Sequence, residues 1–152
     1  MILSSEYYEM KMYPLQNGVL NIVKQSNVPF YLTGGTAVSR AYYNHRYSND
    51  LDFFVNQEND FHQYANTVIE NLKKNGFEWN EKTEILRNAD YISMKIHSRN
   101  FELPLKIDFV NDVSAHFGEI QPTDVYYRTD SIRNILSNKV TAVYRQSGKD
   151  IA

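Results

Sequence analysis

Two aspartates on one short apolar stretch are the residues of this sequence best suited to chemistry. Asp50 and Asp52 lie two positions apart within Asp50–Val55, and the residues between and after them are apolar. In a β-strand successive side chains alternate between the two faces, so both carboxylates would project from one face. Adjacent carboxylates repel each other unless a cation lies between them, and Mg²⁺ is commonly held by one or two carboxylates together with substrate phosphates. The pair therefore predicts a strand that binds Mg²⁺ or Mn²⁺.

A glycine pair upstream predicts a phosphate-binding turn. Phe30–Leu32 is typical of a short buried strand, Gly34 and Gly35 interrupt it, and Thr36–Tyr43 can continue as a helix. Glycine lets a ligand approach the main chain closely, and the first N–H groups of a helix favour an anion. Either fragment alone has a plain explanation, a tight turn or a solvated strand edge. Together, and in this order, they indicate metal-assisted chemistry on a nucleotide.

These two blocks resemble the signature of a known family. Gly34–Ala37 reads Gly-Gly-Thr-Ala, and His45–Phe53 reads His-Arg-x-Ser-x-Asp-Leu-Asp-Phe. Both are similar to AbiEii/AbiGii-type nucleotidyltransferase toxins, a branch of the DNA polymerase β-like nucleotidyltransferase superfamily. Thr36 stands where the wider superfamily has serine. The resemblance implies an α+β fold of the polymerase β type, a small mixed β-sheet flanked by helices that pack mainly against one face.

Asp108 is the candidate for a third carboxylate. It lies in Leu103–Val110, where alternate residues are apolar, and a charged side chain in a core strand is unfavourable unless it is paired or binds a metal. The local pattern allows two interpretations, an aspartate on an open sheet face tied to Lys106 or Lys95, or a functional carboxylate. The resemblance favours the second, because Lys106–Phe109 matches the third-carboxylate strand of the superfamily.

A helix near the end of the sequence supplies a lysine. Apolar residues at helical spacing over 131–145 place Lys139 along their stripe, where a lysine either extends its ammonium to solvent or meets an anion. The segment Lys139–Arg145 followed by Lys149-Asp150 resembles the last family block, with Lys149 as a mild departure. The resemblance implies that Lys139 faces nucleotide phosphates and adds Asp150 to the catalytic residues.

The resemblance assigns roles to these positions. It implies catalytic roles for Asp50, Asp52, Asp108, Lys139 and Asp150, metal binding by the first three, and nucleotide binding by Gly34, Gly35, Thr36, Arg46, Ser48 and Lys139. The four histidines show no metal-ligand spacing. Lys95, His97 and Arg99 form either a cationic ladder toward phosphates or a solvated strand face.

Periodicity predicts the elements that must position these residues. We expect helices over Tyr13–Ser26, Phe61–Leu72 and Ser131–Arg145, a strand beginning at Phe77–Trp79, and strands over Ala89–His97 and Leu103–Val110. Pro14 suits the first turn of the first helix, and Asn75-Gly76 ends the second. The short interval between the last two strands predicts an antiparallel hairpin.

The length suits one compact domain. The 152 residues carry a net charge of −2 and no cysteine, which excludes a disulfide framework and a thiolate zinc site. We expect a cytoplasmic protein without a membrane segment, and a single nucleotidyltransferase domain over 1–152 that lacks the C-terminal helical part of longer relatives.

The predicted function is transfer of an NMP from an NTP to an acceptor hydroxyl. The resemblance alone implies a toxin of a toxin–antitoxin or phage-defence pair, with a cognate antitoxin as partner and tRNA or another RNA as acceptor. Two alternatives stay open, a catalytically impaired nucleotide- or partner-binding module and a small-molecule nucleotidyltransferase of the antibiotic-modifying type.

Overall fold

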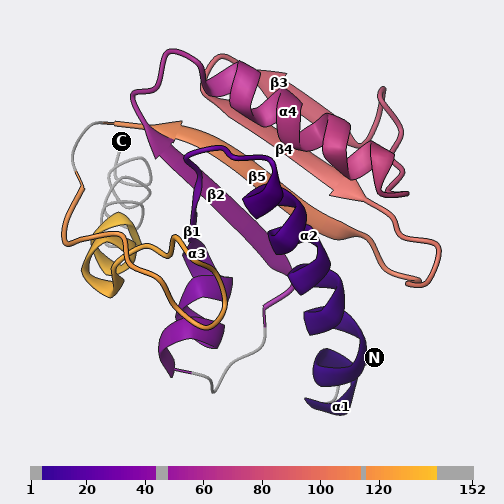
Figure 1. Cartoon of the computed structure of the whole chain (residues 1–152), viewed down its shortest axis with the longest axis horizontal. Coiled ribbons are helices and arrows are strands. Elements are labelled where there is room, and N and C mark those ends of the chain that lie inside the picture. The colour runs from indigo at the N-terminus through magenta and orange to yellow at the C-terminus, as the bar shows by residue number, and fades with distance from the viewer. Residues whose placement is uncertain (1–4, 44–47, 114–115, 140–152) are drawn as a thin grey trace, which may run out of the picture.

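One mixed β-sheet forms the centre of the molecule. The computed structural model describes residues 5–43, 48–113 and 116–139. Within them, five strands lie in the order β1-β2-β5-β4-β3 (Figure 1). Their bounds are β1 Tyr31–Thr33, β2 Asp50–Asn56, β3 Ile85–Asn88, β4 Tyr91–Ile96 and β5 Leu105–Asp112. β2 and β5 are parallel and every other neighbouring pair is antiparallel, which confirms the predicted small mixed sheet and the β4–β5 hairpin.

Helices cover the sheet mainly on one face, as predicted. Figure 1 shows α2 and α4 lying across that face. The helical bounds are α1 Ser5–Tyr7, η1 Tyr8–Met12, α2 Tyr13–Gln25, α3 Gly34–Thr36, η2 Ala37–Tyr43 and α4 Phe61–Lys74, with a further helix over 132–139. The predicted stop at Asn75-Gly76 is confirmed, because Gly76 adopts a φ of +90° directly after α4.

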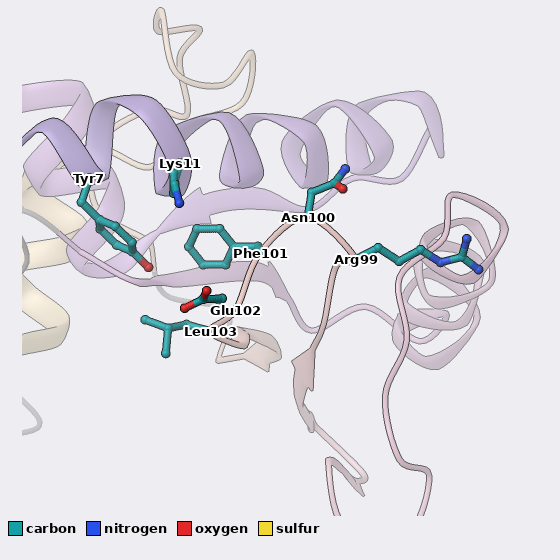
Figure 2. A pocket seen from close by; sticks show the side chains of 7 residues that line it. All are labelled: Tyr7, Lys11, Arg99, Asn100, Phe101, Glu102 and Leu103. Atoms are coloured by element: carbon teal, nitrogen blue, oxygen red, sulfur yellow. The ribbon is translucent and has the colours of Figure 1, made fainter.

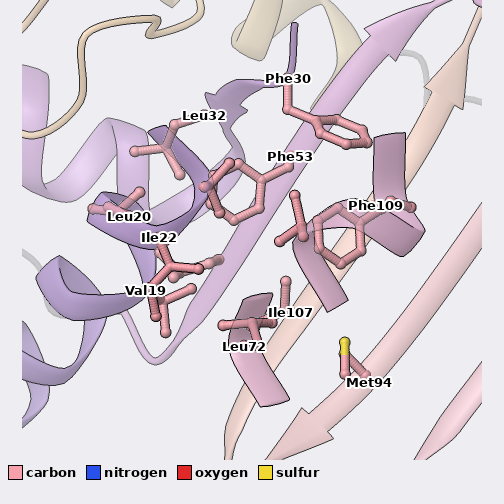
Figure 3. Close-up of a cluster of buried hydrophobic side chains, with 14 of the residues drawn as sticks. Val19, Leu20, Ile22, Phe30, Leu32, Phe53, Leu72, Met94, Ile107 and Phe109 are labelled. Carbon is pink, nitrogen blue, oxygen red and sulfur yellow. The ribbon is translucent and has the colours of Figure 1, made fainter. Parts of the chain in front are cut away.

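The core lies between α2, α4 and the sheet (Figure 3). Alternate residues of β2 and β5 point into it, and the rings of Phe53 and Phe109 stack with centroids 5.8 Å apart. Phe30 adds a third ring 5.2 Å from Phe109. Since one face of each central strand is committed to this apolar layer, the alternate polar residues are held on the opposite face.

The N-terminal helix begins earlier than the sequence predicts. Helical structure runs without a break from Ser5 into α2, and η1 has π-helical geometry. Pro14 has no N–H to donate to the preceding turn, and the wider turn beside it accommodates that loss: the Tyr13 N–H donates to the Tyr8 carbonyl, five residues back. Burial of Tyr8 and Met12 in the core explains why this extra turn forms.

Two strand predictions differ from the structure. Phe77–Trp79 does not begin a strand; only Glu78 pairs, in an isolated bridge with His97. β3 was not predicted, because it is short and carries the exposed Leu86 where a buried apolar residue would mark a strand.

The segment after β5 returns to the outer edge of β1. The Leu32 N–H donates to the Arg128 carbonyl and the Asp130 N–H donates to the Leu32 carbonyl, both at 2.8 Å. This pairing leads directly into the helix over 132–139, the described part of the predicted 131–145 helix; residues 140–145 lie outside the described residues. In the part of the chain that the structure describes, no helix is long and apolar enough to cross a membrane.

Candidate active site

Three aspartates form a row on the sheet face opposite the core. Parallel pairing places Asp52 beside Asp108 and Asp50 beside Lys106. Leu51, Phe53 and Val55 are buried, so Asp50 and Asp52 share the other face, as the sequence predicts. Asp108 joins them there because Ile107 and Phe109 point into the core. The fold thus brings together carboxylates that are more than fifty residues apart in the chain.

Asp52 lies at the centre of the row, and its negative charge is the one least compensated by the surrounding protein. Burial, followed by the negative charges of Asp108 and Asp50, raises the pKa of Asp52 to about 7, while Lys106 opposes the shift. A carboxylate with this pKa is held beside like charges without enough compensating cation. Binding a cation at this point would relieve the strain.

Asp108 is fixed in place by its own neighbours. Its Oδ1 accepts a hydrogen bond from the Ser93 hydroxyl at 2.6 Å and a longer one from Tyr91 at 3.5 Å. Its Oδ2 lies 3.4 Å from the Lys106 ammonium, and its side chain is only 13% exposed. Proximity to Asp108 is the main cause that raises the pKa of Lys106. The structure therefore combines both interpretations of the sequence, since Asp108 is paired with Lys106 and also lies beside Asp52.

The glycine turn lies directly against Asp52. Gly34 has a φ of +75°, and a Cβ at this position would lie 2.3 Å from Oδ2 of Asp52. Both the backbone angle and this contact require glycine. Thr36 is fully buried and its hydroxyl donates to the Asp50 carbonyl, so it fastens the turn to β2. A Cβ on Gly35 would lie 3.4 Å from the Ser48 hydroxyl, which places Ser48 next to the turn.

A buried glutamine that the sequence analysis missed supports the turn. The Gln16 amide donates to the Ser48 carbonyl at 2.8 Å and accepts from the Arg40 guanidinium at 3.0 Å. Gln16 is fully buried on α2, where sequence periodicity gives no reason to expect a polar residue. It connects the N-terminal helix, η2 and the approach to β2.

Lys139 and Asp52 line the same pocket. The pocket has a volume of about 240 Å³ and is lined by Thr33, Gly34, Asp52, Phe54, Ile135, Asn138 and Lys139. Ile135 is buried and Lys139, one turn later, is exposed. The structure thus brings Lys139, the glycine turn and Asp52 to one hollow.

A second buried network, also missed, holds the helix that carries Lys139. The fully buried Asp130 carboxylate accepts hydrogen bonds from Thr33 at 2.7 Å and Asn134 at 2.9 Å, and its other oxygen lies 2.7 Å from Nε2 of His116. Nδ1 of His116 lies 3.1 Å from the Gly118 carbonyl. The two ring nitrogens of His116 thus contact one oxygen each, and these contacts fix the orientation of the imidazole. The contact that joins this network to the sheet, between Asp130 and Thr33, spans 97 residues of sequence, so no local pattern indicated it.

Comparison with known protein families identifies the family of this chain. Residues 22–152 match the family described as "Nucleotidyl transferase AbiEii toxin, Type IV TA system". The chain belongs to the AbiEii nucleotidyltransferase toxin family. The match spans the glycine turn, all three aspartates and Lys139. No curated protein matches the AbiEii chain.

Solved structures share the fold of this AbiEii chain. The crystal structure of JHP933 from Helicobacter pylori aligns with a TM-score of 0.58 and 19% identity, over 91% of this chain and 57% of that one. A candidate nucleotidyltransferase from H. pylori aligns with a TM-score of 0.58 and 19% identity, over 90% of this chain and 59% of that one. The AbiEii chain therefore spans less than two thirds of the length of either structure.

The donor atoms of the AbiEii site suit a hard divalent cation. Among the described residues, no three carboxylate or imidazole side chains converge closely enough to form a ready-made metal site. The aspartate row nevertheless fits a hard divalent cation, because its donor atoms are carboxylate oxygens and the pKa of Asp52, at its centre, is strongly raised. Arg46 and Asp150 lie outside the described residues.

Of the two interpretations of Lys95, His97 and Arg99, the structure does not support the cationic ladder toward phosphates. Lys95 lies on the sheet face of the aspartates, but His97 binds the Glu84 carboxylate, and Arg99 belongs to the β4–β5 connection. Arg99 lines a separate pocket of about 350 Å³, where it points away from the Tyr7 and Phe101 rings (Figure 2). That pocket shares no lining residue with the one that Lys139 and Asp52 line.

Proposed function

We propose that this chain transfers a nucleoside monophosphate from an NTP to an acceptor hydroxyl, with a divalent metal ion bound to the aspartate row. One observation carries the proposal: Asp52, with its pKa raised to about 7, lies beside Asp50 and Asp108 and beneath the Gly34 turn. Carboxylates held together in this way favour a divalent cation. We propose that residues 1–152 act as one nucleotidyltransferase domain.

Each part of the site has a role in this reaction. Asp50, Asp52 and Asp108 would hold Mg²⁺ or Mn²⁺, which when bound polarises the phosphate and offsets its growing charge. The backbone N–H groups at the Gly34–Gly35 turn would bind the outer phosphates of the NTP, with Thr36 fastening the turn to β2. The Lys139 ammonium would reach into the same hollow and stabilise negative charge on the departing pyrophosphate.

The chemical step forms one bond and breaks another. The acceptor oxygen attacks the α-phosphorus, and the bond between that phosphorus and the bridging oxygen of the β-phosphate breaks, so pyrophosphate leaves with the electron pair. The hydroxyl proton passes to Asp108, which Ser93 and Lys106 hold on the side of the row away from the glycine turn.

Family membership extends the proposal to biological partners. We propose that the chain acts as the toxin of a toxin–antitoxin pair with a cognate antitoxin, works in the cytoplasm and uses an RNA such as tRNA as acceptor. The family description supports this assignment.

Calorimetric titration with Mg²⁺ and each NTP tests the proposal. We expect metal-dependent binding that the double substitution Asp50→Asn and Asp52→Asn abolishes, because the donors that hold the cation are then removed. Glu70→Gln is the matched control, since Glu70 is an exposed carboxylate on α4, across the sheet from the row. Equal NTP affinity in the double variant and the wild type would overturn the proposal.

A further inference from the structure

A groove rich in lysine opens beside Asp108. It has a volume of about 330 Å³ and lies over β3, β4 and β5. Lys82, Lys95 and Lys106 line it, together with Tyr91 and Ser93; we call it the lysine groove. Ser93, Tyr91 and Lys106 are also the three side chains that contact Asp108. The lysine groove therefore begins at the aspartate row.

The protein pairs only one of the three lysines in the lysine groove with a carboxylate. Lys106 lies 3.4 Å from Asp108, whereas Lys82 and Lys95 have no ion pair among the described residues. Lys95 and Lys106 lie directly opposite each other on β4 and β5, and like charges in this position are unfavourable. Glu84 is the acidic side chain in the lining, but its two oxygens already bind the Asn80 N–H, at 3.0 Å, and His97. An anion between the two lysines would remove their repulsion.

The strand order separates the lysine groove from the nucleotide side of the site. The Gly34 turn and the Lys139 pocket lie toward β1, whereas the lysine groove lies toward β3, with the aspartates of β2 and β5 between them. Two reacting molecules that meet at the aspartates can thus approach from opposite sides. The rim of the lysine groove also presents Leu86, which is 56% exposed and suits contact with a base.

We propose that the lysine groove binds the phosphodiester backbone of the acceptor, so that the acceptor is a nucleic-acid strand and not a neutral or cationic small molecule. This inference rests on the proposed function, because it assigns the second substrate of the same site. Lys95 and Lys82 contact backbone phosphates, and Lys106 connects that contact to Asp108. The antibiotic-modifying alternative is disfavoured, since a polycationic acceptor would be repelled by the same lysines.

The test measures RNA binding as a function of salt. Fluorescence anisotropy of a labelled single-stranded oligouridylate gives the affinity over a range of KCl concentrations. Each lysine that contacts a phosphate contributes about 0.7 to the slope of log affinity against log salt for a single strand. The double substitution Lys82→Gln and Lys95→Gln should therefore lower that slope by about 1.4. Both side chains are exposed, so the melting temperature should stay close to that of the wild type.

The matched control is Lys74→Gln, an exposed lysine at the end of α4. It should leave the slope and the affinity at wild-type values. The proposal is overturned if the wild type binds no RNA, if the double variant keeps the wild-type slope, or if Lys74→Gln produces the same loss. It is also overturned if an uncharged peptide nucleic acid of the same sequence binds equally well.

Nucleotide binding separates this inference from the proposed function. The double lysine variant should bind Mg²⁺ and NTP like the wild type, whereas a loss of NTP affinity would assign the groove to the nucleotide and overturn the inference. Conversely, the variant with Asp50→Asn and Asp52→Asn should still bind RNA. If the wild type shows no metal-dependent NTP binding but still binds RNA through the lysine groove, the proposed function fails and RNA binding by the groove stands.

Discussion

At the scale of single residues, the aspartates of the row differ in how their charge is compensated. Asp108 has an ammonium and two hydroxyl groups beside it, whereas the main influences on Asp52 are burial and two further carboxylates. The protein thus keeps one carboxylate oriented and leaves its neighbour under strain. Such strain is typical of a position whose natural partner is a ligand rather than the protein.

The strain at Asp52 predicts how stability depends on pH in the presence of a chelator. The folded pKa is about 7 against an ordinary value of 3.8, so the folded state binds this proton more tightly than the unfolded state. The contribution of Asp52 to stability therefore falls as the pH rises from about 4 to about 7, by up to about 4 kcal/mol. Asp52→Asn should match the wild type near pH 4 and become progressively more stable than it toward pH 7.

Denaturant unfolding of both proteins at several pH values provides the measurement. Glu70→Gln controls for the loss of an exposed carboxylate and should run parallel to the wild type. A constant difference between wild type and Asp52→Asn across this range would show that Asp52 is not strained. Added Mg²⁺ should stabilise the wild type most at high pH, where it no longer competes with the proton.

At the scale of elements, the junction of β1 and α3 depends on Gly34, the first residue of α3. Gly34→Ala forces an L side chain into a positive φ and drives its Cβ into the Asp52 carboxylate, so we expect a loss of about 1–3 kcal/mol in the free energy of unfolding and weaker NTP binding. Gly18→Ala is the control. Gly18 lies in α2 with no atom within 4 Å of an added Cβ, so alanine there should add about 0.5–1 kcal/mol. Equal effects of the two substitutions would contradict this account.

Sequence patterns predicted the elements whose signal is local. Alternation of polar and apolar residues predicted that Asp50 and Asp52 share a face of the sheet. The helical stripe predicted α4 with an error of two residues at its C-terminal end. The pattern failed where a tertiary contact decides the structure. Glu78 pairs through one bridge only, and the turn before Pro14 is stabilised by burial of Met12.

The same limit applies to the site. The aspartate row and the glycine turn were predictable because residue type, spacing and strand alternation all point to them. Gln16 and Asp130 were not, because a buried polar residue is recognised only by partners that are distant in the chain. Both position other parts of the candidate site, so the sequence located the proposed reacting groups better than the residues that support them.

At the scale of the whole molecule, Asp130 connects the last described helix to the sheet. Its carboxylate joins Thr33 of β1, Asn134 of the 132–139 helix and His116 of the preceding segment. Asp130→Ala leaves the buried Thr33 and Asn134 donors without their acceptor, and each buried donor left unsatisfied typically costs about 1–3 kcal/mol. Thermal or denaturant unfolding should show this loss, whereas the exposed Asp124→Ala should change stability by less than about 0.5 kcal/mol. A small effect at Asp130 would mean that the helix is held by apolar contacts such as Ile135.

Because that helix carries Lys139 to the pocket that Asp52 also lines, Lys139 distinguishes an enzyme from a nucleotide-binding module. With Mg²⁺, RNA and NTPs labelled at the α-phosphate, the wild type should transfer label to the acceptor. Lys139→Ala should lower the rate about a hundredfold or more, because it removes a group aimed at charge that grows in the transition state. Lys139 is exposed, so stability should change by less than about 0.5 kcal/mol.

Lys74→Ala, at the end of α4, should leave both the transfer rate and stability unchanged. If Lys139→Ala keeps the wild-type rate, the ammonium only extends into solvent and the assignment of Lys139 fails. If the wild type binds Mg²⁺ and NTP but labels neither RNA nor small-molecule acceptors, the chain is a binding module. The two outcomes are distinct, because the first concerns one side chain and the second requires that the aspartate row and glycine turn bind nucleotide without completing transfer.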